Sequence, residues 1–110
     1  MMTKAKPGQF DIYWVGLDPV KGQEMKKTRP CVVVSPDVMN GALGTLIVVP
    51  LTSTITDWPF RMVVSAAGQK SSLACDQIRT ISKGRLGQKI GSLKPAERRQ
   101  LTGLLQEIFA

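Results

Sequence analysis

The sequence predicts a small, partly open β-barrel with helices attached, in the class of mainly β folds with some α. Short apolar runs separated by turn residues recur along most of the chain, which is typical of a small all-β unit. From Pro95 onward the apolar spacing changes to the period of a helix. A chain of 110 residues can bury a core of its own, so we expect one domain spanning residues 1–110.

The strands are expected where apolar residues alternate or form short runs between turn residues. In the first strand Phe10, Ile12 and Trp14 share one face, so we expect Trp14 in the core. The run 45–51 is apolar on both faces, which is typical of a central strand or an interface. The expected strands are 10–18, 31–35, 45–51, 60–65 and 73–81.

Two short helical segments and one long helix are expected. Ser35-Pro36-Asp37 is typical of a helix start, and Asn40-Gly41 ends this short helix. A single helical turn is expected over 83–86. The long helix begins at Pro95, with an acidic residue in its first turn and apolar residues on one face. These apolar residues are Leu101, Leu104, Leu105 and Ile108.

The charge balance points to an anionic partner. Lys and Arg outnumber Asp and Glu by 15 to 8, with no His, and the formal charge is +7. Nucleic acid or an acidic protein fits this charge better than a membrane surface does, although a basic protein can also simply be soluble. The eight carboxylates are scattered along the sequence, so we expect no metal site and no cofactor.

The two cysteines and the absence of a long apolar run bear on the compartment. Cys31 and Cys75 are too few for a disulfide framework, and each lies in an apolar run, so we expect buried free thiols in a reducing cytoplasm. No apolar run approaches the ~20 residues of a membrane span. The N-terminus has no apolar segment of the secretory type.

Arg29 stands where a charged loop enters an apolar strand. The stretch KGQEMKKTRPCVVVSP, residues 21–36, changes from one to the other without a spacer. A strand can hold a guanidinium rigidly beside a cavity at such a junction, with lysines around it. Spacing alone favours the simpler interpretation, an exposed arginine at a strand end.

Three ordered motifs resemble the MazF/PemK toxins of bacterial toxin–antitoxin systems. The first is LDPVKGQE followed by RPCVVVSP, the second is VPLTS at 49–53, and the third is DQIRTI at 76–81. Each motif alone is weak, but their order over a full-length chain is specific. The resemblance implies a homodimeric SH3-like barrel that cuts single-stranded RNA without a metal. It also implies an antitoxin partner with an acidic, disordered tail.

The resemblance implies that Arg29 and Thr52 are catalytic. RNA carries its own nucleophile, the 2′-hydroxyl, and a guanidinium fork suits the anionic phosphorane that forms when it attacks. Thr52 directly follows an apolar strand, and its hydroxyl can hydrogen-bond a phosphate or orient the 2′-hydroxyl. The alternative is an ordinary hydroxyl in a turn, with no role in catalysis. Because there is no His, Glu24 is a candidate general base. It can equally hold Arg29 in an ion pair or be a solvated charge.

Some members of the family use an Arg–Asp pair as acid and base, and this sequence departs from that pattern. Ala74 occupies the position of the arginine, and Gln23 replaces a histidine of the first loop. We therefore expect the Arg29 and Thr52 chemistry, with Asp76 in base recognition or structure. The residues expected to bind RNA are Lys21, Gln23, Lys26, Lys27, Ser53, Trp58, Asp76, Gln77, Arg79 and Arg85.

Two other functions stay open from the sequence. Gyrase-poisoning toxins share the fold and act by binding a protein, but they carry a tryptophan near the C-terminus, where this chain has Phe109. A plain RNA-binding barrel is the second alternative. Trp58 can stack on a base or serve a core or interface role.

Overall fold

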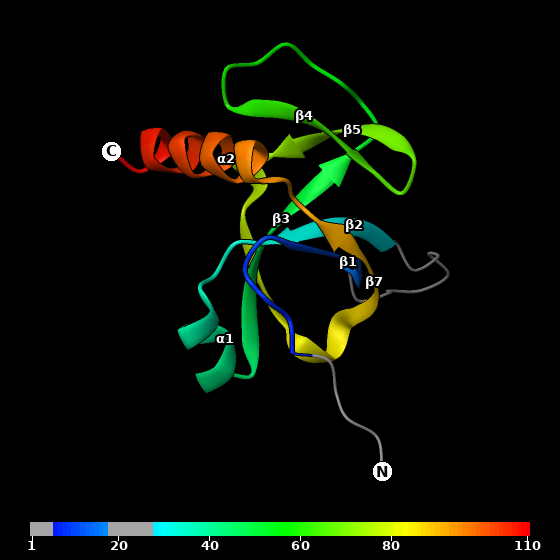
Figure 1. Cartoon of the computed structure of the whole chain (residues 1–110), viewed down its shortest axis with the longest axis vertical. Helices are drawn as coiled ribbons and strands as arrows, with labels where there is room; N and C mark the ends of the chain where they lie inside the picture. Colours follow the sequence, from blue (N-terminus) through cyan, green and yellow to red (C-terminus); the bar gives the residue numbers. More distant parts are fainter. Residues whose placement is uncertain (1–5, 18–27) are drawn as a thin grey trace, which may run out of the picture.

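The computed structural model describes residues 6–17 and 28–110. Within these residues an antiparallel sheet of seven strands curls into a half-barrel, with a long helix at the C-terminus and a short helix that lies apart from it, next to β3 (Figure 1). The predicted class, mainly β with α in a partly open barrel, is confirmed. The elements are β1 Asp11–Gly16, β2 Thr28–Val33, α1 Asp37–Ala42, β3 Thr45–Thr52, β4 Arg61–Ala66, β5 Gln69–Ala74, η1 Cys75–Gln77, β6 Arg79–Ser82, η2 Lys83–Arg85, β7 Leu86–Ser92 and α2 Pro95–Ile108.

Strand β3 is the hub of the sheet. The strands follow the order β4-β5-β3-β2-β1-β7, and β6 also pairs with β3. Both β5 and β6 pair with β3, with Leu51 opposite Leu73 and Leu46 opposite Ile81, and η1 lies between them in the chain. The expectation that the run 45–51 is a central strand is therefore confirmed. None of the helices in the described ranges is long and apolar enough to cross a membrane.

The expected strand at 73–81 is wrong as a single element. The chain forms β5, breaks into the 3-10 turn η1 and resumes as β6. Strand β7 was not expected, because its sequence LGQKIGS lacks a clear alternation of apolar and polar residues. Strand β2 begins at Thr28 instead of Cys31, so Arg29 lies inside a strand and not at its entrance.

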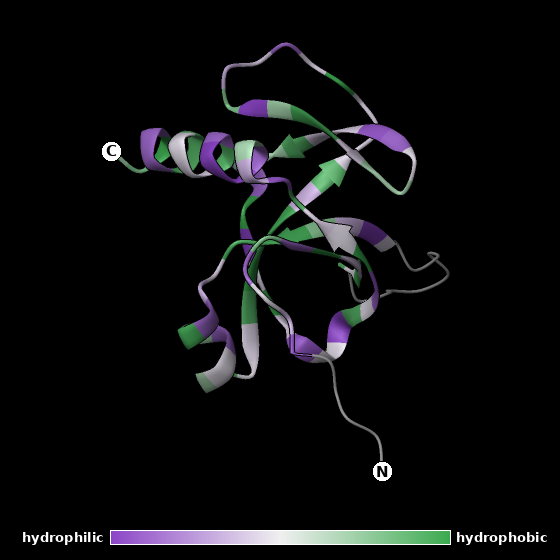
Figure 2. Cartoon of the chain, viewed as in Figure 1, coloured by the Kyte–Doolittle hydropathy of each residue, from purple (hydrophilic) through white to green (hydrophobic). Residues whose placement is uncertain are grey.

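The core has two parts, one on each face of the central strands. Ile12, Val32 and Val49 belong to the first part, which also includes Leu101 of α2. Tyr13 belongs to the second part, which also includes Ile81 of β6. Figure 2 shows these strands as largely hydrophobic segments at the centre of the molecule. Because both faces of β3 are covered within one chain, its apolar pattern requires no partner molecule.

Trp14 is not in the core, and the prediction that it would be buried is wrong. Its side chain is 38% exposed, whereas Ile12, Tyr13 and Val15 are all buried. Tyr13 and Val15 belong to the second part of the core and Ile12 to the first, so Trp14 shares the face of Ile12 at a place that the first part of the core does not cover. β7 passes close to this site, because a Cβ on Gly87 would lie 3.1 Å from the Trp14 carbonyl oxygen.

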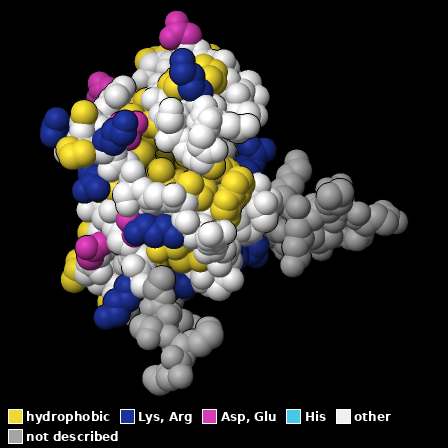
Figure 3. All heavy atoms as spheres, turned by 45° about the vertical axis from the view of Figure 1, so that its right-hand side comes forward, with side chains coloured by type: hydrophobic (Ala, Val, Ile, Leu, Met, Phe, Trp, Pro, Cys, Tyr) yellow, Lys and Arg dark blue, Asp and Glu magenta, His cyan; other side chains and the backbone are white. Residues whose placement is uncertain are grey.

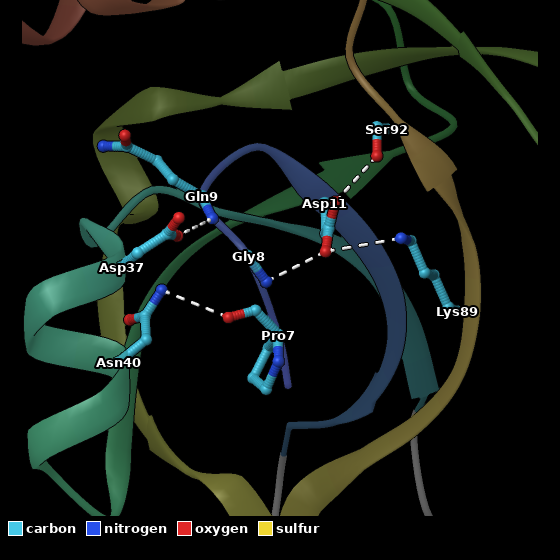
Figure 4. Close-up of polar contacts among 8 residues, drawn as sticks. All are labelled: Pro7, Gly8, Gln9, Asp11, Asp37, Asn40, Lys89 and Ser92. Atoms are coloured by element: carbon cyan, nitrogen blue, oxygen red, sulfur yellow. Dashed lines mark hydrogen bonds and ion pairs between the residues drawn. The ribbon is translucent and has the colours of Figure 1, made fainter. Parts of the chain in front are cut away.

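Polar contacts tie the segment before β1 to its neighbours (Figure 4). The Asp11 carboxylate accepts a hydrogen bond from Ser92 Oγ at 2.7 Å and lies 3.5 Å from Lys89 Nζ, both on β7. Asp37 at the start of α1 accepts from the backbone N–H of Gln9 at 2.8 Å. These contacts join the beginning of the described chain to the last strand and to α1.

The C-terminal helix forms as the sequence predicts. Pro95 stands in its first turn, and the Glu97 carboxylate accepts from the Lys94 backbone N–H at 2.8 Å. Leu101 is fully buried, and Leu104 and Leu105 pack against the same core. The helix lies beside β4 (Figure 1), so the apolar face seen in the sequence covers the open side of the sheet.

Candidate active site

A pocket of about 350 Å³ opens where strands β2, β3, β4 and β6 meet η1. It combines Leu17 and Pro50 with three guanidinium groups, a hydroxyl and an amide, which is a surface suited to an anionic ligand. On the face shown in Figure 3, Lys and Arg side chains stand on several sides of an exposed hydrophobic stretch. The residues that line the pocket are Leu17, Arg29, Pro50, Thr52, Arg61, Gln77 and Arg79.

Arg29 and Thr52 share this pocket because of the strand register. β2 pairs with β3 such that Cys31 lies opposite Pro50, and continuing that ladder by two positions brings Arg29 opposite Thr52. Both side chains are partly exposed. Thr52 Oγ1 accepts a hydrogen bond from the Thr54 backbone N–H at 3.2 Å, which uses an oxygen lone pair and not the hydroxyl proton.

Arg61 is a pocket residue that sequence reasoning missed. It is the first residue of β4 and the cross-strand partner of Ala74. Its Nε and Nη2 atoms donate to Oδ1 and Oδ2 of Asp76 at 3.0 and 3.2 Å. No spacing rule joins positions 61 and 76. The available signal was indirect: an arginine at the second position of the expected strand 60–65, three residues after Trp58.

Asp76 is consequently an ion-pair partner. The hydrogen bond from Arg61 is the main reason that the pKa of the Asp76 carboxyl is lowered, against a smaller opposing effect of burial. The Arg61 side chain is only 8% exposed and that of Asp76 is 35% exposed. A carboxylate held in this way is stabilised as the anion, so it is a poor proton acceptor.

Trp58 packs beside this ion pair. The Arg61 guanidinium carbon lies 4.8 Å from the centre of the Trp58 ring, and the Phe60 ring centroid lies 5.4 Å from it. Trp58 is nevertheless 47% exposed. Of the two interpretations open from the sequence, a core position is wrong within this chain, and a role in stacking or in an interface remains.

Arg79 and Arg85 both contact the end of β1. Arg79 Nη2 donates to the Leu17 carbonyl oxygen at 3.0 Å, and Arg85 Nη1 donates to that of Gly16 at 3.1 Å. Arg79 also lines the pocket, as does Gln77, whereas Arg85 is not among the lining residues. These arginines hold the chain at the point where it leaves the sheet toward residue 18.

Six expected site residues either stay outside the pocket or lie outside the described part of the chain. Ser53 is exposed directly after Thr52 but does not line the pocket. Five others lie outside the described residues, in the segment that joins Leu17 to Thr28. They are Lys21, Gln23, Glu24, Lys26 and Lys27.

The two cysteines are buried and free, as the sequence predicts. Burial raises the pKa of Cys31 to about 12, against the opposing effect of Arg79 and Arg29. Burial also raises the pKa of Cys75 to about 11, with a further increase from Asp76. Neither thiol is therefore a nucleophile at neutral pH. Within residues 6–17 and 28–110, no three Cys, Asp or Glu side chains gather in the manner of a metal site.

Comparisons with known proteins agree with this arrangement of motifs. Residues 8–109 match the family described as PemK-like, MazF-like toxin of type II toxin–antitoxin system. The endoribonuclease toxin MazF of Escherichia coli K12 is 34% identical over 98 residues, which is 88% of each chain. Endoribonuclease MazF9 of Mycobacterium tuberculosis H37Rv is 38% identical over 106 residues, covering 87% of this chain and 90% of that protein.

A solved structure shows the same fold. A mycobacterial endoribonuclease in complex with its cognate antitoxin superposes with a TM-score of 0.79 over 94% of both chains, at 22% sequence identity. The fold, the ordered motifs and the match over nearly the whole chain lead to one conclusion. The chain belongs to the family of PemK-like, MazF-like toxins of type II toxin–antitoxin systems.

Proposed function

We propose that this chain is the endoribonuclease toxin of a toxin–antitoxin pair, and that it cuts single-stranded RNA by attack of the 2′-hydroxyl, without a metal. The observation that carries the proposal is the meeting of Arg29 and Thr52 in one pocket with two further arginines. Relatives that share 34% and 38% of the aligned residues are endoribonucleases, which supports the same reaction class.

The reaction needs three things from the protein. A base takes the proton of the 2′-hydroxyl, whose oxygen then bonds to phosphorus. The crowded phosphorane carries extra negative charge, and Arg29 stabilises it with a bidentate pair of N–H groups. The bond from phosphorus to the 5′-oxygen then breaks, and that oxygen leaves with a proton taken from water. The products are a 2′,3′-cyclic phosphate and a 5′-hydroxyl.

Thr52 and Glu24 have the remaining roles in this proposal. The Thr52 hydroxyl hydrogen-bonds the reacting phosphate or orients the 2′-hydroxyl, with its oxygen held by the Thr54 N–H. Glu24 is the proposed base, since the chain has no histidine and Asp76 is paired with Arg61. Gln77 and Arg79 lie in the same pocket and are proposed to contact the base edges and phosphates of the RNA.

The proposed partners follow from charge and exposed apolar surface. A protein with an acidic tail suits a chain of net charge +7, and it is proposed to block the pocket as the cognate antitoxin. A second copy of the chain is proposed to cover the exposed apolar residues at the end of α2, where Phe109 is 68% exposed. The proposed compartment is the cytoplasm, where the buried thiols stay reduced.

One assay tests the reaction class. A mixed-sequence RNA is incubated with the purified protein in EDTA and resolved on a gel. We expect discrete fragments with 2′,3′-cyclic phosphate ends. Intact RNA in a shifted band would favour the RNA-binding barrel. Intact and unshifted RNA would favour a toxin that acts on a protein such as gyrase.

A modified substrate tests the mechanism. Once a cut site is mapped, the same RNA is made with a single 2′-deoxy nucleotide immediately 5′ of the scissile phosphate. We expect it to bind normally and to stay intact, because it lacks the nucleophile. Cleavage of this substrate, or activity that appears only after magnesium is added, would contradict the proposed mechanism.

A further inference from the structure

We infer that Trp58, Arg61 and Asp76 form a nucleotide-binding subsite at the edge of the pocket. Arg61 binds a phosphate of the RNA there, and the exposed part of Trp58 stacks on the adjacent base. This inference rests on the proposed function, because its ligand is the RNA substrate. It assigns Arg61 as a positioning residue for the strand that is cut, and it gives Asp76 the task of holding Arg61.

The Arg61 guanidinium is ordered before any ligand arrives. Two hydrogen bonds join it to Asp76, and its carbon lies 4.8 Å from the centre of the Trp58 ring. The side chain is 8% exposed. A charged group whose geometry is already set loses little conformational freedom on binding, so its interaction with a phosphate is strengthened accordingly.

Arg61 keeps hydrogen-bond donors for a second anion. A guanidinium carries N–H groups on Nε, Nη1 and Nη2. The bonds to Asp76 use the Nε hydrogen and one Nη2 hydrogen, so both Nη1 hydrogens and the other Nη2 hydrogen are not used by that carboxylate. Arg61 lines the same pocket as Arg29 and Thr52, so this residue borders the site where a phosphate of the substrate is proposed to bind.

Trp58 supplies the stacking surface of the subsite. It remains 47% exposed although Arg61 and Phe60 both pack against its ring. An exposed indole that is held by its neighbours is suited to an unpaired base, and stacking of this kind tolerates any base. The subsite therefore fixes the position of the RNA strand and contributes little to the choice of RNA sequence.

The charge of Asp76 allows a test that depends on whether a substitution tightens or weakens RNA binding. If Asp76 were only a negative charge beside the pocket, its replacement by asparagine would tighten RNA binding. If Asp76 holds Arg61 in place, Asp76→Asn weakens binding when Arg61 is present. In an Arg61→Gln background Asp76 no longer has a guanidinium to hold, so Asp76→Asn only removes a negative charge and then tightens binding. A reversal of this kind is expected for two coupled residues and not for two charges that act independently.

The binding experiment uses a probe that cannot be cut. The ligand is a mixed-sequence single strand with 2′-deoxy sugars throughout, and its affinity is measured by fluorescence anisotropy over a range of salt concentrations. For Arg61→Gln we expect about tenfold weaker binding and a salt slope smaller by about 0.7, the value for one phosphate contact on a single strand. Partial unfolding would lower the binding-competent fraction and leave the slope unchanged.

Lys70→Gln is the matched control, because it removes one positive charge from the same hairpin. Lys70 is exposed and pairs with Ser65, four positions along the ladder from Arg61, or about 13 Å away. We expect its salt slope to equal that of the wild type. An Arg61→Gln protein with the affinity and slope of the Lys70→Gln control would overturn the assignment of Arg61.

Fluorescence tests the stacking. The chain has two tryptophans, so Trp14→Phe leaves Trp58 as the only one. We expect the single strand to quench Trp58 emission in step with the anisotropy, and unchanged emission at saturation would overturn the stacking. The cleavage assay with natural RNA is run in parallel. Wild-type protein that binds the probe but does not cut RNA contradicts the proposed function. Wild-type protein that cuts RNA, together with an Arg61→Gln variant that binds like the Lys70→Gln control, contradicts only this subsite.

Discussion

Arg29 on β2 and Thr52 on β3 each lie two residues beyond the last paired positions of one strand ladder, Cys31 opposite Pro50, and they line the same pocket. Their relative position is therefore set by backbone hydrogen bonds between two strands of the sheet. A guanidinium and a hydroxyl placed in this way need little rearrangement when charge develops on a phosphate. The separate contributions of these two side chains can be measured.

Replacement of Arg29 by alanine should nearly abolish cleavage. Removing one preorganised donor of this kind typically lowers kcat by ~10²–10³. Arg29 is only partly buried, so we expect a normal thermal unfolding curve. Arg29→Lys should restore little activity, because a point charge does not reproduce a bidentate fork. Cleavage by the alanine variant at the wild-type rate would show that Arg29 is not catalytic.

Replacement of Thr52 by valine keeps the β-branched shape and removes the hydroxyl. We expect slower cleavage with nearly unchanged stability, since Thr52 is only partly buried. Thr80→Val is the control, because Thr80 is an exposed threonine on β6 that does not line the pocket. If the Thr52 variant cuts as fast as this control, the catalytic hydroxyl belongs to Ser53 or Thr54 instead.

The chain should form a homodimer. Ile108 and Phe109 at the end of α2 are 38% and 68% exposed, and Val63 on β4 is 48% exposed, so these apolar side chains are available for contact with a second copy. Light scattering at micromolar concentration should give about twice the chain mass of 12.0 kDa. A Phe109→Asp variant should shift this mass toward the monomer. A monomeric mass for the wild-type protein would contradict the expectation.

The ion pair of Asp76 with Arg61 should make stability sensitive to acid. Arg61 lowers the pKa of Asp76 below its ordinary value of 3.8, so the folded state favours the ionised carboxylate. The resulting stabilisation is complete above that value and is lost as the pH falls through the folded-state pKa. The difference in unfolding free energy between wild type and Asp76→Asn should therefore be constant near neutral pH and shrink below about pH 4. Parallel curves at all pH values would contradict this.

The two thiols should be inert in the folded protein. Cys31 and Cys75 are buried, with pKa values raised to about 12 and about 11, so neither forms a thiolate at pH 8. A chromogenic disulfide reagent should react with no thiol in the native state and with both in guanidinium chloride. Rapid reaction of one thiol in the native protein would mean that its strand opens readily.

The sequence by itself determined the elements whose signals are local. The helix from Pro95 to Ile108 could be predicted because its start signal and its helical spacing of apolar residues both lie in the same short stretch of sequence. The run that became β3 is apolar on both faces, which limited it to a central strand or an interface before the structure showed it to be central. The motifs also singled out Arg29 and Thr52, which share a pocket in the structure.

Only the tertiary structure decided which distant residues meet. Arg61 pairs with Asp76 because β4 and β5 place Arg61 opposite Ala74, two residues before that carboxylate, and no local pattern encodes this register. Trp14 lies outside the core although the alternation in the sequence places it on the same face as the buried Ile12, because that face is covered at Ile12 and not at Trp14. The physical reason is the same in both cases: a strand's own sequence determines which residues share a face, but its neighbours in the sheet determine what covers that face.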